Sequence, residues 1–145
     1  MVKSINVKSL ILLFLTITSS GFLGCAYQKK IWATRASYSY NHALKWKEVD
    51  DAAAYLSREN KVGLIKIKRN LEKNLDLIDF EIMDAIWNKK EGIVIIKVRK
   101  KYVLYPDNTY KEKVFEEKWK KEGGKWIVLT PFTIYNEKPK KANNN

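Results

Sequence analysis

Three charged side chains fall among apolar positions in the second half of the chain, and they are the groups best suited to acid–base chemistry. By alternation along its segment, Asp84 shares the apolar side, while Lys100 and Glu117 interrupt a face that is otherwise apolar and aromatic. A carboxyl group in an apolar pocket has a raised pKa and serves as a general base. Asp84 and Glu117 are therefore the catalytic candidates. The alternative, which we favour, is that all three lie near strand ends and are hydrated.

Other patterns that carry chemistry are missing from the sequence. The single His and single Cys exclude a disulfide framework and an ordinary zinc site within one subunit. His42 stands beside Ala43 and Leu44 in a helical pattern, which favours a packed or surface position over a catalytic one. No nucleophile motif, glycine-rich phosphate loop or carboxylate cluster with metal-ligand spacing occurs. We therefore expect no metal and no cofactor, and a non-enzymatic protein is favoured over an enzyme.

Residues 1–24 have the order of a secretory signal peptide. Lys3 and Lys8 precede an apolar run at 10–18, and small residues follow at 19–21. A membrane-spanning helix needs about 20 apolar residues, so this run is short. The alternative is an uncleaved N-terminal anchor helix in which Cys25 is merely buried.

The sequence Gly-Phe-Leu-Gly-Cys at 21–25 resembles the lipobox of bacterial lipoproteins, with Phe22 where that family usually has Leu. The resemblance implies cleavage before Cys25, a thioether-linked diacylglycerol on its sulfur, and a palmitate-type acyl chain on its new amino group. A lone exported thiol would otherwise stay unpaired, and several acyl chains give lasting attachment. Because Ala26 rather than Asp follows, the resemblance implies the outer membrane, with the domain facing the periplasm.

The chain is strongly basic, with 28 Lys and Arg against 16 Asp and Glu and a formal charge of +12. Removal of residues 1–24 takes away two lysines and no acid, which leaves +10. Export argues against nucleic acid as the partner. Anionic lipid, wall polymers or another envelope protein fit better, although a merely solvated charged surface is the interpretation we favour.

Composition divides the chain into four parts: a signal peptide at 1–24, a lipidated tether at 25–31, one folded domain at 32–135, and a polar disordered tail at 136–145. Helical spacing predicts two helices between the N-cap Thr34 and about residue 57, with a bend near 47–50. A short amphipathic helix is predicted at 61–73.

After residue 74 the period changes to that of strands, predicted at 78–83, 93–105, 110–121 and 126–132. If Gly123 and Gly124 form a hairpin turn, Trp119 faces Val128; if residues 106–109 form the preceding turn, Ile96 faces Trp119. This register separates two faces. The ring residues on the apolar face are the candidates for a ligand pocket: Tyr102, Phe115, Trp119 and Trp126. The opposite face carries a basic set: Lys97, Arg99, Lys101, Lys118 and Lys120.

This pattern predicts an α+β domain, with N-terminal helices covering the aromatic face of an antiparallel sheet. The helical sequences at 40–46 and 50–56, the strand at 78–82 and the Trp-Lys-Lys-Glu-Gly-Gly-Lys-Trp hairpin at 119–126 resemble the small nuclear-transport-factor-2-like (cystatin-like) lipoproteins of bacteria. The resemblance implies a curved sheet wrapped around a helix as a cone. It implies no single function, because such cones serve as isomerases, dehydratases, binding modules and scaffolds.

Two functions follow from the sequence. The first is a non-enzymatic envelope lipoprotein that acts as a binding or scaffold module. The second is a cone that binds a small apolar ligand, or is an enzyme, through a buried carboxylate. A deep cavity lined by the ring residues favours the second function, and a cone filled by its own aromatic side chains favours the first. A third possibility is that the basic set contacts anionic lipid. The two Trp residues that fit the core pattern least well, Trp32 and Trp87, are candidates for an interface.

Overall fold

The computed structural model describes residues 21–63, 68–69 and 72–131, and these form helices followed by an antiparallel meander. The helical elements are α2 (Gly21–Lys45), α3 (Val49–Ala53) and the 3₁₀-helix η1 (Glu59–Val62). The strands are β1 (Leu75–Asn88), β2 (Ile93–Leu104), β3 (Thr109–Glu122) and β4 (Lys125–Val128), in the order β1-β2-β3-β4. The predicted α+β class and meander are confirmed. The predicted tail at 136–145 and residues 1–20 of the predicted signal peptide lie outside the described residues.

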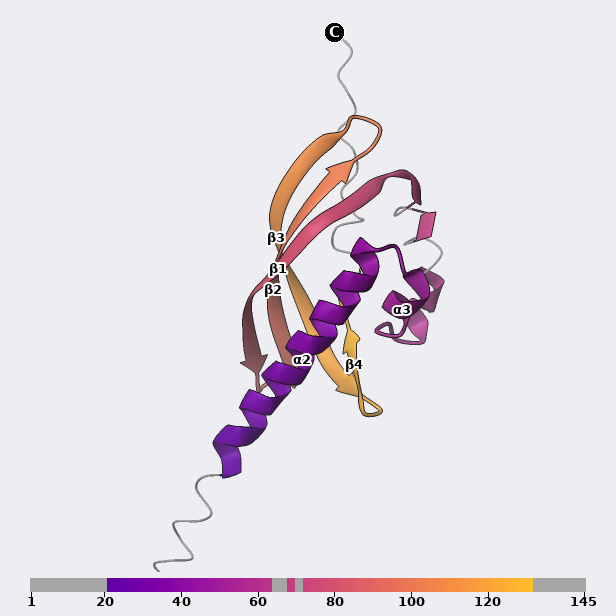
Figure 1. The fold of residues 1–145 in the computed structure, drawn as a ribbon. Coiled ribbons are helices and arrows are strands. Elements are labelled where there is room, and N and C mark those ends of the chain that lie inside the picture. Colours follow the sequence, from indigo (N-terminus) through magenta and orange to yellow (C-terminus); the bar gives the residue numbers. More distant parts are fainter. Residues whose placement is uncertain (1–20, 64–67, 70–71, 132–145) are drawn as a thin grey trace, which may run out of the picture.

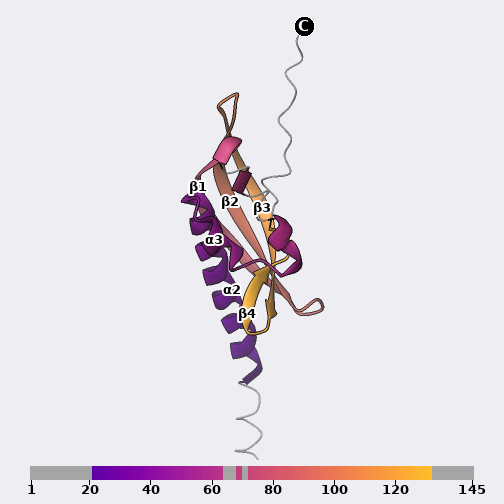
Figure 2. The same ribbon diagram turned by 90° about the vertical axis from the view of Figure 1, so that its right-hand side faces the viewer.

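Helix α2 packs across one face of the twisted sheet (Figure 1), and the view from the side shows helix and sheet as two layers (Figure 2). Its buried residues follow the three-to-four-residue spacing of one helix face. These residues are Ala33, Ala36, Ser37, Tyr40, Asn41, Ala43 and Leu44. The expectation that a helix covers the aromatic face is therefore confirmed.

The helix begins thirteen residues before the predicted N-cap at Thr34, so that prediction is wrong. Residues 26–31 contain neither Gly nor Pro, and Gln28, Lys29 and Lys30 are good helix formers, so nothing interrupts the helix. The bend is confirmed, because Lys47 adopts a φ of 60° between α2 and α3. The second helix ends at Ala53, not near residue 57.

The amphipathic helix predicted at 61–73 lies partly outside the described residues, because 64–67 and 70–71 are not described. Of the remainder, residues 63, 68–69 and 72–73 are helical.

Two β-bulges in β1 change which side chains face the helix. The register between β1 and β2 shifts between Leu77 and Asp79 and again between Ile82 and Asp84. Each extra residue turns the following side chains to the opposite face. The prediction that Asp84 lies on the apolar side is therefore wrong: Asp84 pairs with Lys97 on the outer face and is exposed. The first bulge likewise leaves Ile78 48% exposed.

The β3–β4 hairpin has the predicted register, with Trp119 opposite Val128. Gly123 and Gly124 form its turn with φ values of 54° and 82°, which side chains with a Cβ rarely adopt.

The β2–β3 register differs from the prediction by two residues, because the turn is formed by 105–108 and not by 106–109. Asn108 takes the positive φ of 51° that closes this turn, and Thr109 is already paired with Leu104. Trp119 consequently faces Val94 rather than Ile96. A shift of two residues preserves the faces, so the predicted division into an apolar and a charged face holds.

Candidate functional site

A buried polar cluster joins α2 to the centre of the sheet. Glu117 of β3 is 1% exposed and accepts hydrogen bonds on both carboxylate oxygens. Its Oε1 accepts from Lys100 Nζ at 2.8 Å and Asn41 Nδ2 at 3.0 Å. Its Oε2 accepts from Ser37 Oγ at 2.7 Å and Trp119 Nε1 at 3.0 Å. These five residues, all buried, are called the Glu117 cluster below. The favoured expectation that Lys100 and Glu117 are hydrated near strand ends is therefore wrong.

The Glu117 cluster holds its carboxylate in the charged form. Burial raises the pKa of Glu117, but the Lys100 charge and the hydrogen bonds from Lys100, Ser37 and Asn41 outweigh it and leave the pKa below its ordinary value. The raised pKa expected of a general base is therefore the opposite of what this carboxyl has. Because all its acceptor positions face protein donors under α2, Glu117 serves to hold the helix on the sheet.

The pH dependence of stability tests whether the Glu117 carboxyl is ionised in the folded protein. The pKa of Glu117 is lower in the folded than in the unfolded chain, so its stabilisation is complete above the ordinary value of 4.5 and is lost as the pH falls below that value. We expect the urea midpoint to fall between pH ~5 and pH ~3. A Lys100→Met/Glu117→Leu variant should show a flatter dependence over the same range. Equal slopes for both proteins would contradict the assignment.

The ring residues expected to line a pocket fill the space between α2 and the sheet. Trp119 and Tyr102 are fully buried and Phe115 is 5% exposed. Tyr40 of α2 packs edge-on against Trp119, with ring centroids 5.8 Å apart. Trp126 is only partly buried and lines a cleft. The concave face of the sheet is thus occupied by the protein's own side chains.

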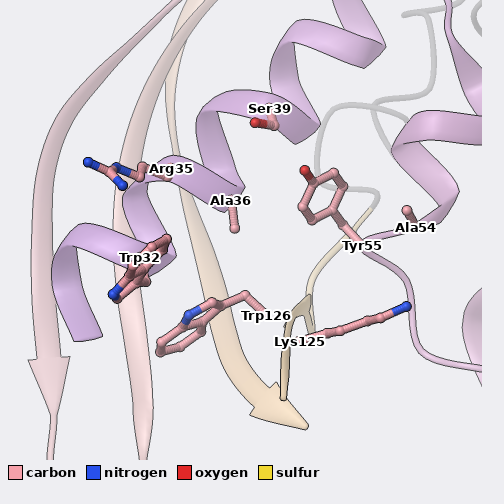
Figure 3. Close-up of a pocket in the computed structure, with 8 residues that line it drawn as sticks. All are labelled: Trp32, Arg35, Ala36, Ser39, Ala54, Tyr55, Lys125 and Trp126. Atoms are coloured by element: carbon pink, nitrogen blue, oxygen red, sulfur yellow. The ribbon is translucent and has the colours of Figure 1, made fainter. Parts of the chain in front are cut away.

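The cleft lies outside this core, between α2, the segment after α3, and β4 (Figure 3). Its volume is about 350 Å³. The lining residues are Trp32, Arg35, Ala36, Ser39, Ala54, Tyr55, Lys125 and Trp126. It is called the Trp32 cleft below.

The Trp32 cleft combines aromatic rings with positive charge. Its described lining includes two cations and no acid. The Arg35 guanidinium carbon lies 5.0 Å from the centre of the Trp32 ring, a cation–π contact. Figure 3 shows the charged ends of Arg35 and Lys125 on opposite sides of the cleft, with Trp126 and Tyr55 between them. The arrangement suits an extended ligand with an apolar middle and anionic ends.

The sequence predicts two of the residues that line this cleft, Trp32 as an interface candidate and Trp126 as a pocket candidate. Trp32 was singled out because it did not fit the core pattern, and it is 55% exposed. Arg35, Ser39 and Tyr55 were missed, because only the packing of α2 against the segment after α3 brings them together. Trp87 is half-buried, and Lys29 Nζ lies 4.3 Å above its ring.

The five basic residues predicted as one surface lie on the outer face, but acids stand among them. Arg99 lies 2.9 Å from Glu81 and 3.5 Å from Glu112. Lys97 is opposite Glu116 on one side and Asp84 on the other. The outer face is therefore of mixed charge, a poor match for an anionic surface.

His42 is exposed on α2, where it stacks on Tyr38 at 6.2 Å and lies 6.2 Å from the Trp46 ring. Cys25 is exposed in α2. Within the described ranges, no three His, Cys, Asp or Glu side chains gather in a way that would hold a metal ion. No helix in the described part of the chain has both the length and the apolarity to cross a membrane.

Comparisons with models of protein families, with curated proteins and with solved structures gave no match to this chain.

Proposed function

We propose that the protein is a lipid-anchored binding module of the bacterial cell envelope, attached through Cys25 and facing the periplasm from the outer membrane. The main support is that α2 fills the concave face, while the Trp32 cleft outside it brings the exposed Trp32 together with Trp126 and two cations, Arg35 and Lys125. The alternative function, a ligand-binding or catalytic site built on a buried carboxylate, lacks support. Both carboxylate oxygens of Glu117 already accept hydrogen bonds from protein side chains. We also propose a nuclear-transport-factor-2-like fold, supported by the helix packed on a curved antiparallel sheet.

The Trp32 cleft selects its ligand by charge and shape. Arg35 and Lys125 favour anionic groups, and the rings between them favour an apolar body. An extended acidic segment of another envelope protein, with an apolar residue between its acids, has both properties. The chain would then act as a scaffold that holds such a partner close to the membrane.

The binding test uses a synthetic peptide in which a leucine lies between two glutamates. Saturable shifts of the Trp32 and Trp126 indole N–H resonances are expected on titration, with no shift for Trp46. The Trp32→Ala variant should bind about tenfold more weakly, since a central Trp often dominates an interface. Trp46→Ala is the matched control, because Trp46 directly follows the end of α2, is 62% exposed and lies outside the cleft. Equal weakening by both substitutions, or equal binding of the lysine version of the peptide, would contradict the proposal.

A further inference from the structure

Three segments that are distant in sequence lie at one end of the molecule. These are the first turns of α2, the β1–β2 turn and the β3–β4 turn (Figure 1). Lys29 on α2 contacts Trp87 near the end of β1. Trp32, one turn further along, shares its cleft with Lys125 and Trp126 of the β3–β4 hairpin. The region formed by these segments is called the α2 end below.

The α2 end concentrates positive charge. Its lysines outnumber its acids, Glu91 and Glu122, and Glu122 lies 3.5 Å from one of them. The lysines are Lys29, Lys30, Lys89, Lys90, Lys120, Lys121 and Lys125. Asn88 fixes the β1–β2 turn, since its Oδ1 accepts hydrogen bonds from the backbone N–H groups of Lys90 at 3.1 Å and Glu91 at 3.2 Å. The lysines are therefore displayed on α2, on the ends of β3 and β4, and on the turn that Asn88 holds.

The α2 end also exposes aromatic side chains. Tyr27 is 64% exposed and Trp32 is 55% exposed. Aromatic residues with one polar atom favour the boundary between lipid and water, and neighbouring lysines add attraction to anionic headgroups. Basic and aromatic side chains together are thus typical of a surface that rests on a membrane.

The helix sets the distance between this surface and Cys25. Trp32 follows Cys25 by seven residues within α2, which is about 10 Å along a helix axis. A lipid on Cys25 would hold the α2 end against the headgroup layer, because a helix joins the two rather than a flexible linker.

We propose that the α2 end binds the anionic phospholipid surface of the membrane, as a second attachment beside the lipid on Cys25. This inference rests on the proposed envelope location. Because several acyl chains on Cys25 already give lasting attachment, this second contact would set how the domain lies against the headgroups. The Trp32 cleft, which borders the α2 end, would then open close to the membrane surface.

The test uses the full chain with Cys25→Ser, so that no lipid anchor contributes. Binding is measured by sedimentation with phosphatidylcholine vesicles and with vesicles that also contain phosphatidylglycerol. We expect stronger binding to the anionic vesicles and weaker binding as salt rises from ~0.1 M to ~0.5 M. Because the measurement needs no lipidation, its failure is distinct from failure of the Cys25 assignment.

Two matched triple substitutions locate the surface. Replacement of Lys30, Lys89 and Lys90 by Gln should lower the partition constant for anionic vesicles at least about tenfold. The reason is that each lysine near an anionic surface adds to the free energy of binding. Replacement of Lys97, Lys101 and Lys118 by Gln removes the same amount of charge from the outer face. This variant should change the partition constant less than about twofold. Residues 1–24 are identical in both variants, so any contribution of these residues to vesicle binding is the same in both.

Three results would overturn the proposal: equal losses from the two triple variants, no preference for anionic vesicles, or binding that soluble glycerophosphate abolishes. The last result would indicate a pocket for free phosphate groups rather than a membrane surface. Unchanged circular dichroism spectra and melting temperatures of both variants will show that the comparison is between folded proteins.

Discussion

Replacement of Glu117 by Gln will lower the free energy of unfolding by about 3–5 kcal/mol, the range found when a buried ion pair loses one partner. All four groups that contact the Glu117 carboxylate are hydrogen-bond donors. A glutamine amide has one acceptor oxygen and one donor nitrogen, so its NH₂ group would face two donors. The ammonium group of Lys100, 3% exposed, would also lose its counter-charge. Urea unfolding of the folded variant measures the loss.

Two further variants control for other causes. Glu116→Gln changes the neighbouring carboxyl, which is exposed on the outer face, and should cost less than about 0.5 kcal/mol. The double variant Lys100→Met/Glu117→Leu removes both charges and should recover part of the stability lost in Glu117→Gln, because no ammonium group is left without its counter-charge. The recovery is only partial, because Ser37, Asn41 and Trp119 still lose their acceptor. A Glu117→Gln cost as small as that of Glu116→Gln would contradict the role of the Glu117 cluster.

Replacement of Cys25 by Ser will abolish fatty-acid labelling and leave the precursor uncleaved. The reason is chemical: a serine hydroxyl lacks the thiolate nucleophile that forms the thioether. Metabolic labelling followed by electrophoresis measures both effects. Phe22→Leu is the control, since it restores the residue usual in the resembled lipobox and should leave labelling intact. Labelling that persists in Cys25→Ser would contradict the assignment.

The structure implies one physical requirement if the precursor is cleaved before Cys25. Because Cys25 lies within α2, the first turn of the helix would have to open. Gly21 and Gly24 occupy that turn, and each destabilises a helix by about 1 kcal/mol relative to Ala. The sequence before Cys25 is therefore the part of α2 that opens most easily, while the good helix formers after it stay ordered.

The sequence was sufficient for the element order and the two faces of the sheet. Alternation separated Trp119 and Phe115 from Lys118 and Lys120, and the Gly123-Gly124 pair specified the last hairpin. The predicted β2–β3 register is wrong by two residues, because Asn108 supplies the positive φ that closes the turn one residue earlier than expected.

Other features of the fold and of the site depend on local irregularities and tertiary contacts, which the hydrophobic periodicity of the sequence does not reveal. Regular alternation cannot reveal the bulges that turn Asp84 outward, because each bulge is a local break in that alternation. Glu117 is correctly placed on the apolar face, but its ionisation depends first on Lys100 and then on Ser37 and Asn41, which are 80 and 76 residues away in the chain. The Trp32 cleft is likewise a tertiary feature, formed where α2 and the hairpin meet.

The proposed function requires a folded module that is attached to the membrane by its own cysteine. The most direct measurement is the mass of the N-terminal peptide of protein purified from cell membranes. The predicted result is a peptide that begins at Cys25 and carries a diacylglyceryl group on sulfur and an acyl chain on nitrogen. A peptide that retains residues 1–24, or one that begins at Cys25 with an unmodified thiol, would contradict it.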